Sequence, residues 1–240
     1  MVHRPVGRPG SQANLLSLFL AERRDPGPFY ERLAQDAAAD LRGRLAGRTV
    51  LDLGCGPGHY TRALRAAGAK VVPMDAFFDE LFLAGGPPAG AIVGDARRLP
   101  LADASVDGVL CSNMLEHTPQ PMAVIDELER VVRPGGWMWL SWTNWYSPWG
   151  GHEVAPWHYL GGRRAARIYE RRTGHPPKND PGTSLFPLHI GPTVADLRRR
   201  EHVRVRDVRP RYFPSQRWVL RVPGVREVIT WNCLILLERV

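Results

Sequence analysis

The sequence predicts an α/β fold built on a doubly wound sheet, and three observations point to it. Short apolar runs alternate with helical segments from residue 48 onward, one apolar run ends in a glycine-rich loop, and a strongly apolar segment closes the chain. Strands that alternate with helices form a parallel sheet covered by helices on both faces. With 240 residues, of which 44% are apolar and 23% charged, the chain can bury such a core as one domain.

Two amphipathic segments precede the alternating pattern. They span residues 12–23 and 28–45, and the sequence Asp25-Pro26-Gly27-Pro28 separates them. Proline and glycine interrupt helices, so two separate helices are expected here. We therefore predict that residues 1–47 form an N-terminal helical extension.

The alternating core is expected over residues 48–142 and resumes at 191–240. The expected strands are 49–53, 70–74, 91–93, 106–111, 137–142, 203–208 and 231–238, and the helices between them are 60–67, 121–132 and 193–200. Residues 143–190 break this pattern with a segment rich in Trp, Gly, Pro and His that holds one expected helix, 163–172. A long irregular segment in a compact domain is usually functional, so we predict a substrate-cap insertion.

Charge is unevenly distributed along the chain, whose formal net charge is +8. Residues 161–226 contain sixteen Lys or Arg and five Asp or Glu. Such a segment can attract nucleic acid, although its nearly exclusive use of arginine is also typical of GC-rich coding sequence. Because no RNA-recognition motif is visible, we do not expect a nucleic-acid partner.

Cysteine usage and hydropathy indicate a cytoplasmic protein. Cys55, Cys111 and Cys233 lack the paired spacing of a disulfide framework or of a zinc site. The longest early apolar stretch, residues 15–21, is too short for a membrane span and runs into charged residues, not a cleavage site. The sequence leaves the oligomeric state open.

The most informative segment is the apolar run that ends in the glycine loop. Asp52 lies two residues before Gly54, and Gly56 and Gly58 follow at every second position. Glycine at these positions lets a ligand approach the backbone closely. The spacing G-x-G-x-G differs from the dinucleotide pattern, and no G-K-[ST] sequence follows to hold a triphosphate. An NAD dehydrogenase therefore fits poorly.

Further motifs follow the next expected strands. Asp75 ends the second strand, Gly94-Asp95-Ala96 follows the third, and residues 112–117 (Ser-Asn-Met-Leu-Glu-His) follow the fourth. The turn Arg133-Pro134-Gly135-Gly136 precedes the fifth strand. Each carboxylate alone could cap a turn or a helix. Three carboxylates at successive strand ends instead favour a binding site at the carboxyl edge of the sheet.

These motifs together resemble the class I S-adenosylmethionine-dependent methyltransferases, in the methyltransferase type 11, quinone-biosynthesis-like group. The resemblance covers about residues 48–142. It implies a Rossmann-like seven-stranded sheet and S-adenosylmethionine as the cofactor. It further implies that Asp52 reaches the cofactor's amino group, that Asp75 accepts both ribose hydroxyls, and that Asp95 and Ala96 contact adenine. The cofactor-binding residues implied are Asp52, Gly54, Cys55, Gly56, Gly58, Asp75, Asp95, Ala96, Asn113 and Met114.

Methyl transfer to a hydroxyl requires an aligned acceptor and removal of the hydroxyl proton. The candidate catalytic residues are His152 and Glu153 in the cap and His117 in the core. Histidine is suited to proton transfer near neutral pH, and His158 is a further candidate base. His117 lies in a motif that recurs in the family whatever the acceptor, which favours a structural or cofactor-side role for it. His152 could act as the base, bind the acceptor or be structural.

Six of the eight tryptophans lie between residues 137 and 157. Trp137 and Trp139 alternate on a strand and are expected to pack beneath helices. The expected substrate-binding residues are Trp145, Tyr146, Trp149, Trp157 and His158. Flat rings among polar groups suit a saccharide or a polyhydroxylated natural product, although the same rings could seal the cap or a subunit contact.

The sequence therefore predicts a methyltransferase that O-methylates a small-molecule or oligosaccharide acceptor. The cap resembles a bacterial branch in which some members are associated with polysaccharide or cell-envelope glycan synthesis. Methylation of a quinone or an amine is the alternative, RNA methylation follows it, and a non-catalytic cofactor-binding protein comes last. No metal is expected because no carboxylate-rich cluster with ligand spacing is visible, although acids from distant segments could still meet in the fold.

Overall fold

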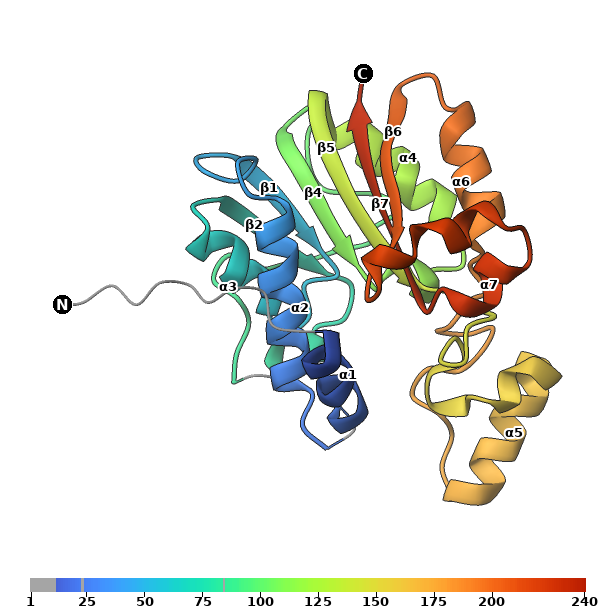
Figure 1. Ribbon diagram of the computed structural model, residues 1–240. Coiled ribbons are helices and arrows are strands. Elements are labelled where there is room, and N and C mark those ends of the chain that lie inside the picture. The colour runs from blue at the N-terminus through green and yellow to red at the C-terminus, as the bar shows by residue number, and fades with distance from the viewer. Residues whose placement is uncertain (1–11, 23, 84) are drawn as a thin grey trace.

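A computed structural model describes residues 12–22, 24–83 and 85–240 of the chain. Its centre is a seven-stranded sheet with the order β3-β2-β1-β4-β5-β7-β6 (Figure 1). Strands β1 to β5 are parallel, whereas β7 is antiparallel to both β5 and β6. The predicted α/β class and doubly wound sheet are therefore confirmed. The strand order reverses between β1 and β4, which is where sheets of this type form a ligand-binding crevice.

The strands follow the predicted pattern closely. They are β1 (Thr49–Leu53), β2 (Lys70–Asp75), β3 (Ile92–Val93), β4 (Val106–Ser112), β5 (Val132–Thr143), β6 (Val203–Pro210) and β7 (Asn232–Arg239). β5 begins earlier than expected because Val132 already pairs with Val106, after which residues 133–136 bulge out and pairing resumes between Trp137 and Gly108.

The helices are α1 (Gln12–Ala21), α2 (Gly27–Asp40), α3 (His59–Ala66), α4 (Pro121–Val131), α5 (Gly162–Thr173), α6 (Ile190–Arg199) and α7 (Val225–Ile229). Residues 1–11 and Arg23 of the expected N-terminal extension lie outside the described residues. The 3₁₀ helix η5 (Pro214–Arg221) and α7 fill a connection for which the sequence pattern predicted no element.

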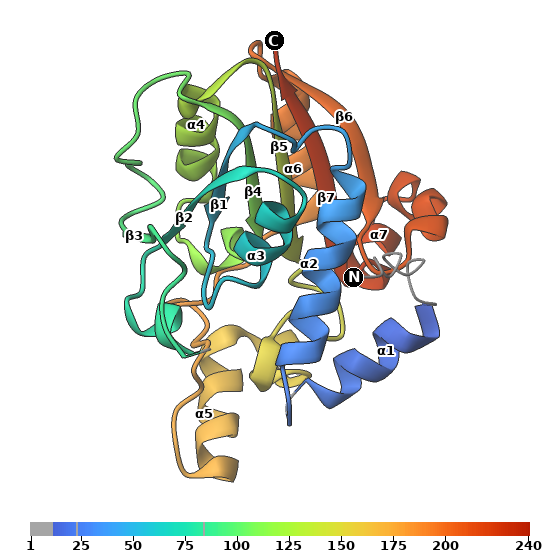
Figure 2. The ribbon, with the colours of Figure 1, turned by 90° about the vertical axis from the view of Figure 1, so that its left-hand side faces the viewer.

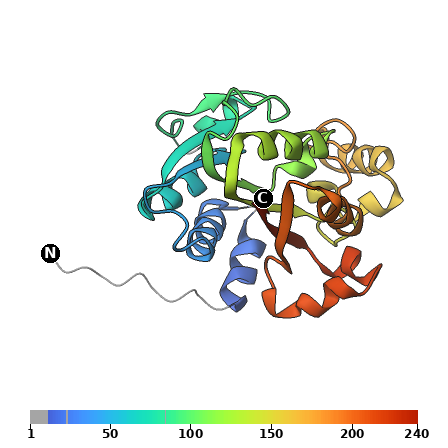
Figure 3. The ribbon, with the colours of Figure 1, turned by 90° about the horizontal axis from the view of Figure 1, so that it is seen from above.

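Alternating side chains of the strands build two apolar layers, one on each face of the sheet. Leu51, Val109 and Met138 pack with α4 and α6 on one face. Val50 and Leu110 pack with α2 and α3 on the other. Figure 3 shows the blue α2 and the yellow-green α4 on opposite sides of the strands. Both faces are thus buried, as the apolar strand sequences require.

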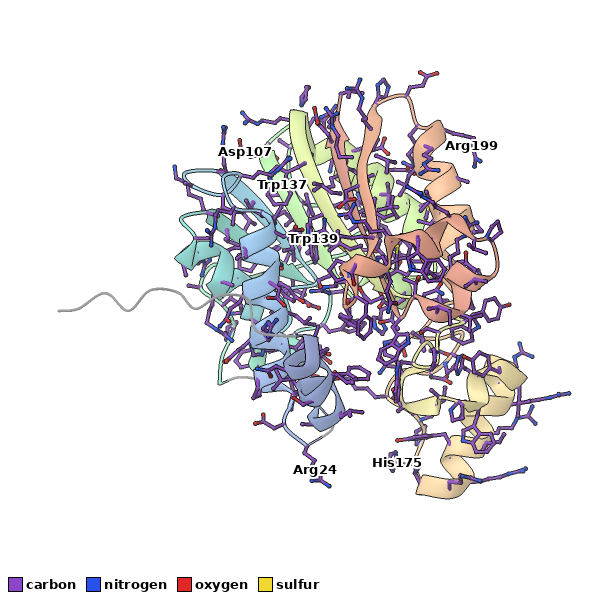
Figure 4. All side chains as sticks on the ribbon, in the orientation of Figure 1. Arg24, Asp107, Trp137, Trp139, His175 and Arg199 are labelled. Carbon is purple, nitrogen blue, oxygen red and sulfur yellow. The ribbon has the colours of Figure 1, made fainter. Side chains whose placement is uncertain are left out.

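Trp137 and Trp139 belong to the layer beneath α2, as predicted, and lie within the body of the domain (Figure 4). The indole Nε1 of Trp139 donates a hydrogen bond of 2.7 Å to Asp40 Oδ2 at the end of α2. This bond satisfies the only polar atom of a buried ring and fixes α2 against the sheet.

The segment between β5 and α6 forms a separate layer beneath the carboxyl ends of the parallel strands (Figure 1). It contains the 3₁₀ helices η3 (His152–Val154) and η4 (Trp157–Leu160), followed by α5, which extends away from the sheet (Figure 2). We call residues 144–189 the cap. Among the described residues, no helix is long and apolar enough to cross a membrane.

Candidate active site

A cleft of about 2100 Å³ opens at the carboxyl edge of the parallel strands. Its walls come from the glycine loop after β1, the ends of β2 and β4, the cap, and the α1–α2 segment. Single small-molecule sites usually measure about 300–1,000 Å³. The cleft is therefore large enough for two ligands side by side.

The glycine loop holds its shape through backbone hydrogen bonds to β2. Gly54 N and Cys55 N donate to Met74 O at 2.8 and 3.1 Å, and Gly56 N donates to Asp75 Oδ2 at 2.8 Å. Gly54 and Gly56 both have positive φ, of 74° and 46°. A Cβ on Gly54 would lie 2.8 Å from the side chain of Met114, so only glycine fits between the loop and the segment after β4.

Asp75 lies at the end of β2, and its carboxylate lines the cleft. Its Oδ2 accepts from Gly56 N, and its Oδ1 accepts from Phe77 N at 3.0 Å. Each carboxylate oxygen can accept a further hydrogen bond. The Asp75 carboxylate can therefore accept hydrogen bonds from two neighbouring hydroxyl groups of a ligand.

Asp52 is 1% exposed and is not among the residues that line the cleft. Its Oδ2 accepts a hydrogen bond of 2.5 Å from Thr61 Oγ1, while its Oδ1 has no partner among the described residues. Burial raises the pKa of Asp52 to about 7, although the Thr61 hydroxyl partly offsets this effect. Asp52 is thus enclosed within β1 and does not line the cleft.

Asp95 and Ala96 lie at the cleft wall after β3. Asp95 forms an ion pair of 2.7 Å with Arg97 and also accepts from Arg97 N at 2.8 Å. These hydrogen bonds lower the pKa of the Asp95 carboxyl. The carboxylate is therefore ionised, and a ligand amine would share it with Arg97.

Asn113 and Met114 follow β4 and line the cleft beside the glycine loop. Asn113 has a φ of 52°, and its backbone N donates to Ser141 O at 2.8 Å. Its Oδ1 accepts from Arg211 Nη1 at 3.1 Å and from Asn232 Nδ2 at 3.0 Å. Side chains from the antiparallel end of the sheet thus fix the residue in a left-handed conformation that asparagine tolerates.

His117 meets His152 across the boundary between the core and the cap. Their ring centroids lie 5.1 Å apart in an edge-to-face arrangement, and both residues line the cleft. Burial, and then the nearby His117, lower the pKa of His152 to about 4. The fold therefore brings two of the three expected catalytic side chains together.

Glu153 also lines the cleft, but its carboxylate is engaged. Its Oε1 accepts from Asn179 N at 2.7 Å and its Oε2 from Asn179 Nδ2 at 2.8 Å. Burial opposes ionisation of Glu153, yet these hydrogen bonds leave its pKa lower than usual. Glu153 thus connects the 3₁₀ helix η3 to the irregular segment of the cap that follows α5.

The expected substrate-binding residues divide into one at the cleft and four away from it. Trp149 lines the cleft, whereas Trp145 is buried edge-to-face against His158 with ring centroids 5.4 Å apart. Tyr146 stacks on His189 at 4.9 Å, and Trp157 lies under the Arg172 guanidinium at 4.6 Å. The structure does not bring the three cap tryptophans together as one wall. Gly58, likewise, does not line the cleft; it is the N-cap residue that precedes α3.

The sequence of the chain is similar to those of known proteins, and these similarities identify its family. Residues 51–140 match a family described as a methyltransferase domain. A protein of Mycobacteroides abscessus named as an uncharacterized methyltransferase is 41% identical over 245 residues, covering 94% of this chain and 92% of the relative. A protein of the same description from Mycobacterium ulcerans is 43% identical over 238 residues, covering 93% and 92%.

Solved structures share the fold at lower identity. An S-adenosylmethionine-dependent methyltransferase from Mesorhizobium loti has a TM-score of 0.59 and 19% identity, covering 86% of this chain and 98% of that one. A putative S-adenosylmethionine-dependent methyltransferase from Listeria monocytogenes has a TM-score of 0.60 and 16% identity, covering 87% and 98%. The chain belongs to the class I S-adenosylmethionine-dependent methyltransferases.

The methyltransferase's cleft fits S-adenosylmethionine on two observations of the structure. A Cβ added to Gly56 at the cleft wall would meet no protein atom, so the space in front of the loop is open to a ligand. The Asp75 carboxylate, which accepts from Gly56 N of that loop, and Asn113 both line the same cleft, so a ribose and the sulfur end of the cofactor can be held there. We expect the loop backbone to hold the methionine part.

Several residues of this methyltransferase's cleft were not predicted from the sequence. Phe19, Phe29 and Tyr30 reach it from α1 and α2, and Tyr212 and Trp231 reach it from the far end of the sheet. Arg211 was counted only within a basic segment, yet its guanidinium contacts Asn113 and the buried Ser112. The only local signal was the aromatic content of the two N-terminal segments.

The first prediction concerns the ribose contact. Replacing Asp75 with Ala removes a charged acceptor from the cleft, so S-adenosylhomocysteine should bind about 1.5–3 kcal/mol more weakly. Asp79→Ala is the matched control, because that carboxylate is exposed and does not line the cleft. Isothermal titration calorimetry measures both affinities. Equal affinity in the wild type and in Asp75→Ala would remove Asp75 from the cofactor site.

The second prediction concerns the pH dependence of stability. Because burial raises the pKa of Asp52 from 3.8 to about 7, the native state keeps a proton that the unfolded chain has already lost in this range. The free energy of unfolding should therefore fall as the pH rises from 4 to 7, by up to about 4 kcal/mol, and level off above pH 7. The Asp52→Asn variant should lack this decrease. Urea unfolding of the wild type and the variant at pH 5, 6, 7 and 8 tests the prediction. A difference in the free energy of unfolding between the two proteins that stays constant with pH would contradict it.

Proposed function

We propose that the methyltransferase transfers its methyl group to a hydroxyl of a saccharide or a polyhydroxylated natural product. The observation that carries this proposal is the part of the cleft lined by the cap and by α1 and α2, which we call the acceptor half. Its lining includes both aromatic rings and hydrogen-bonding groups. The rings of a saccharide or a similar compound present apolar C–H faces and polar hydroxyl edges. Aromatic side chains can pack on the faces, and hydrogen-bonding side chains can bind the hydroxyls.

The aromatic wall of this half consists of Phe19, Phe29, Trp149, Tyr212 and Trp231. Phe19 and Trp149 contact edge-to-face at 5.1 Å, and Trp149 and Trp231 do so at 5.8 Å. The rings come from α1, α2, the cap and the two ends of the β6–β7 connection, so they support one another across the fold. Rings fixed in this way lose little further entropy when an acceptor packs on them.

Polar groups also line the cleft. The N-terminal helices and their connection contribute Glu22, Asp25 and Glu31, and the cap contributes Asn179, Thr183 and Ser184. Carboxylates, an amide and hydroxyls are all suited to binding sugar hydroxyls. A quinone would use the rings and leave many of these groups without a ligand partner, so we rank quinones and amines second.

Proton removal falls to the histidines at the junction of core and cap. When bound, S-adenosylmethionine supplies a methyl group that forms a bond to the acceptor oxygen while the electrons of its C–S bond pass to sulfur. His152 lines the cleft, and its Nδ1 lies 3.4 Å from Gly150 O. With a proton on Nδ1, its Nε2 can accept the proton of the acceptor hydroxyl. His117 has its Nδ1 engaged by Ser184 O at 2.8 Å, which fixes the orientation of its ring.

The third prediction tests His152. His152 has a φ of 50°, a conformation that asparagine tolerates, so His152→Asn removes the imidazole with little backbone strain. Turnover should fall by about two to four powers of ten while the affinity for S-adenosylhomocysteine stays nearly unchanged. His175→Asn, at the far end of the cap (Figure 4), is the control. Near-normal turnover in His152→Asn would exclude a direct role in proton transfer.

The fourth prediction separates the acceptor classes in a methyl-transfer screen over oligosaccharides, polyhydroxylated natural products, quinones and total RNA. Trp149→Leu should lower kcat/KM by about 10-fold or more, whereas Trp157→Leu should not, because Trp157 packs within the cap against Arg172. The rate of methyl transfer to the hydroxyl acceptor should also change little between low and high salt concentration. Activity on RNA alone, falling steeply with salt and unaffected by Trp149→Leu, would contradict the proposal. Activity on quinones alone would support the second candidate.

A further inference from the structure

Three potential metal ligands from two distant segments meet at the junction of core and cap. Glu116 and His117 belong to the 3₁₀ helix η2 (Leu115–His117) after β4, and His152 begins η3 in the cap. One possible ligand atom of each residue lies within 4.8 Å of those of the other two. The cluster was not predicted from the sequence, because His152 lies 35 residues after the adjacent pair Glu116 and His117.

Glu116 has an oxygen whose binding capacity is unused. The residue is 1% exposed, and its Oε1 accepts a hydrogen bond of 2.8 Å from Thr143 N. Its Oε2 is buried and has no hydrogen-bond partner among the described residues. A buried carboxylate oxygen without a partner is costly, since buried polar atoms are nearly always paired. A cation between the carboxylate and the two imidazoles would satisfy it.

The two histidines are oriented as metal-binding histidines usually are. His117 Nδ1 lies 2.8 Å from Ser184 O, and His152 Nδ1 lies 3.4 Å from Gly150 O. When one ring nitrogen donates its proton to a carbonyl oxygen, the other nitrogen presents a lone pair to the metal. Both histidines line the cleft, and each Nδ1 faces a carbonyl oxygen. The Nε2 atoms are therefore the ones available to bind a metal.

We propose that Glu116, His117 and His152 bind a divalent transition-metal ion, for which Zn²⁺ is the best match. Two imidazoles and one carboxylate are a recognised ligand set for zinc with an open fourth position. Mg²⁺ and Ca²⁺ are poorer matches because they prefer all-oxygen ligands. Zinc holds nitrogen and oxygen ligands at about 2.0–2.2 Å, so the three side chains must close on the ion by a small rotation.

The open position would face the acceptor half of the cleft, since both histidines line it. A hydroxyl bound there loses its proton more readily, because the cation stabilises the oxygen anion. With the metal bound, the proton passes to water in the cleft and His152 serves as a metal ligand, which replaces the direct proton transfer to its Nε2 in the metal-free protein. Metal binding itself goes beyond the proposed function, because it needs neither an acceptor nor methyl transfer.

The test uses the full-length protein, stripped with a chelator and titrated with ZnCl₂ by calorimetry and with Co²⁺ by visible absorption. The wild type should bind one ion per chain. Glu116→Gln, which keeps the Oε1 acceptor for Thr143 N, and His152→Asn should each weaken Zn²⁺ binding by at least about 10-fold. His175→Asn should bind like the wild type.

S-adenosylhomocysteine affinity checks that each variant is folded. An unchanged Zn²⁺ affinity in both Glu116→Gln and His152→Asn, or no Zn²⁺ binding by the wild type, would overturn the metal site. The result also separates this inference from the proposed function. Loss of turnover in His152→Asn with unchanged Zn²⁺ binding supports a metal-free base and refutes the metal site. Loss of Zn²⁺ binding with unchanged turnover supports the metal site and refutes a catalytic role for it.

Discussion

The guanidinium of Arg211 joins the strand ends on which the rest of the site depends. The residue follows the edge strand β6, yet its Nη1 donates to Ser112 Oγ and Ser141 Oγ, each at 2.9 Å. Its Nη2 donates to the Tyr60 hydroxyl at 2.5 Å. The central Cζ atom of the guanidinium lies 4.8 Å from the centroid of the Trp139 ring. One side chain thus connects α3, β4 and β5 at the carboxyl edge. Without it, the buried Ser112 and Ser141 hydroxyls would each lose a hydrogen-bond donor.

This network determines where the two halves of the cleft meet. Arg211 and Asn232 hold the Asn113 amide beside the glycine loop, and the loop is fixed in turn by the Asp75 carboxylate. The cofactor half is therefore built from rigid strand ends, which suits a ligand that must be placed precisely. The acceptor half is built from the cap and the N-terminal helices, whose contacts are aromatic and hydrogen-bonded. Variation in those segments can change the acceptor without disturbing the cofactor half.

The parts that the sequence predicted correctly depend on local patterns. β1 was predicted residue for residue because its apolar run ends directly in the glycine loop, and Asp75 was placed at the end of β2 by the same reasoning. The parts that it missed depend on contacts between distant segments. Arg211 meets Tyr60 across 151 residues, and Glu116 meets His152 only because the cap folds back beneath β4. Tryptophan content alone could not show that Trp157 packs on Arg172 while Trp149 faces the cleft.

A crystal structure of the complex with S-adenosylhomocysteine would test the central claim most directly, namely that one cleft places the cofactor's sulfur between the strand ends and the cap. The account predicts that the ribose hydroxyls bind Asp75 and that the sulfur lies beside Asn113 and faces the space bounded by His117, His152 and Trp149. A ribose bound away from Asp75, or a sulfur directed away from the two histidines, would contradict it.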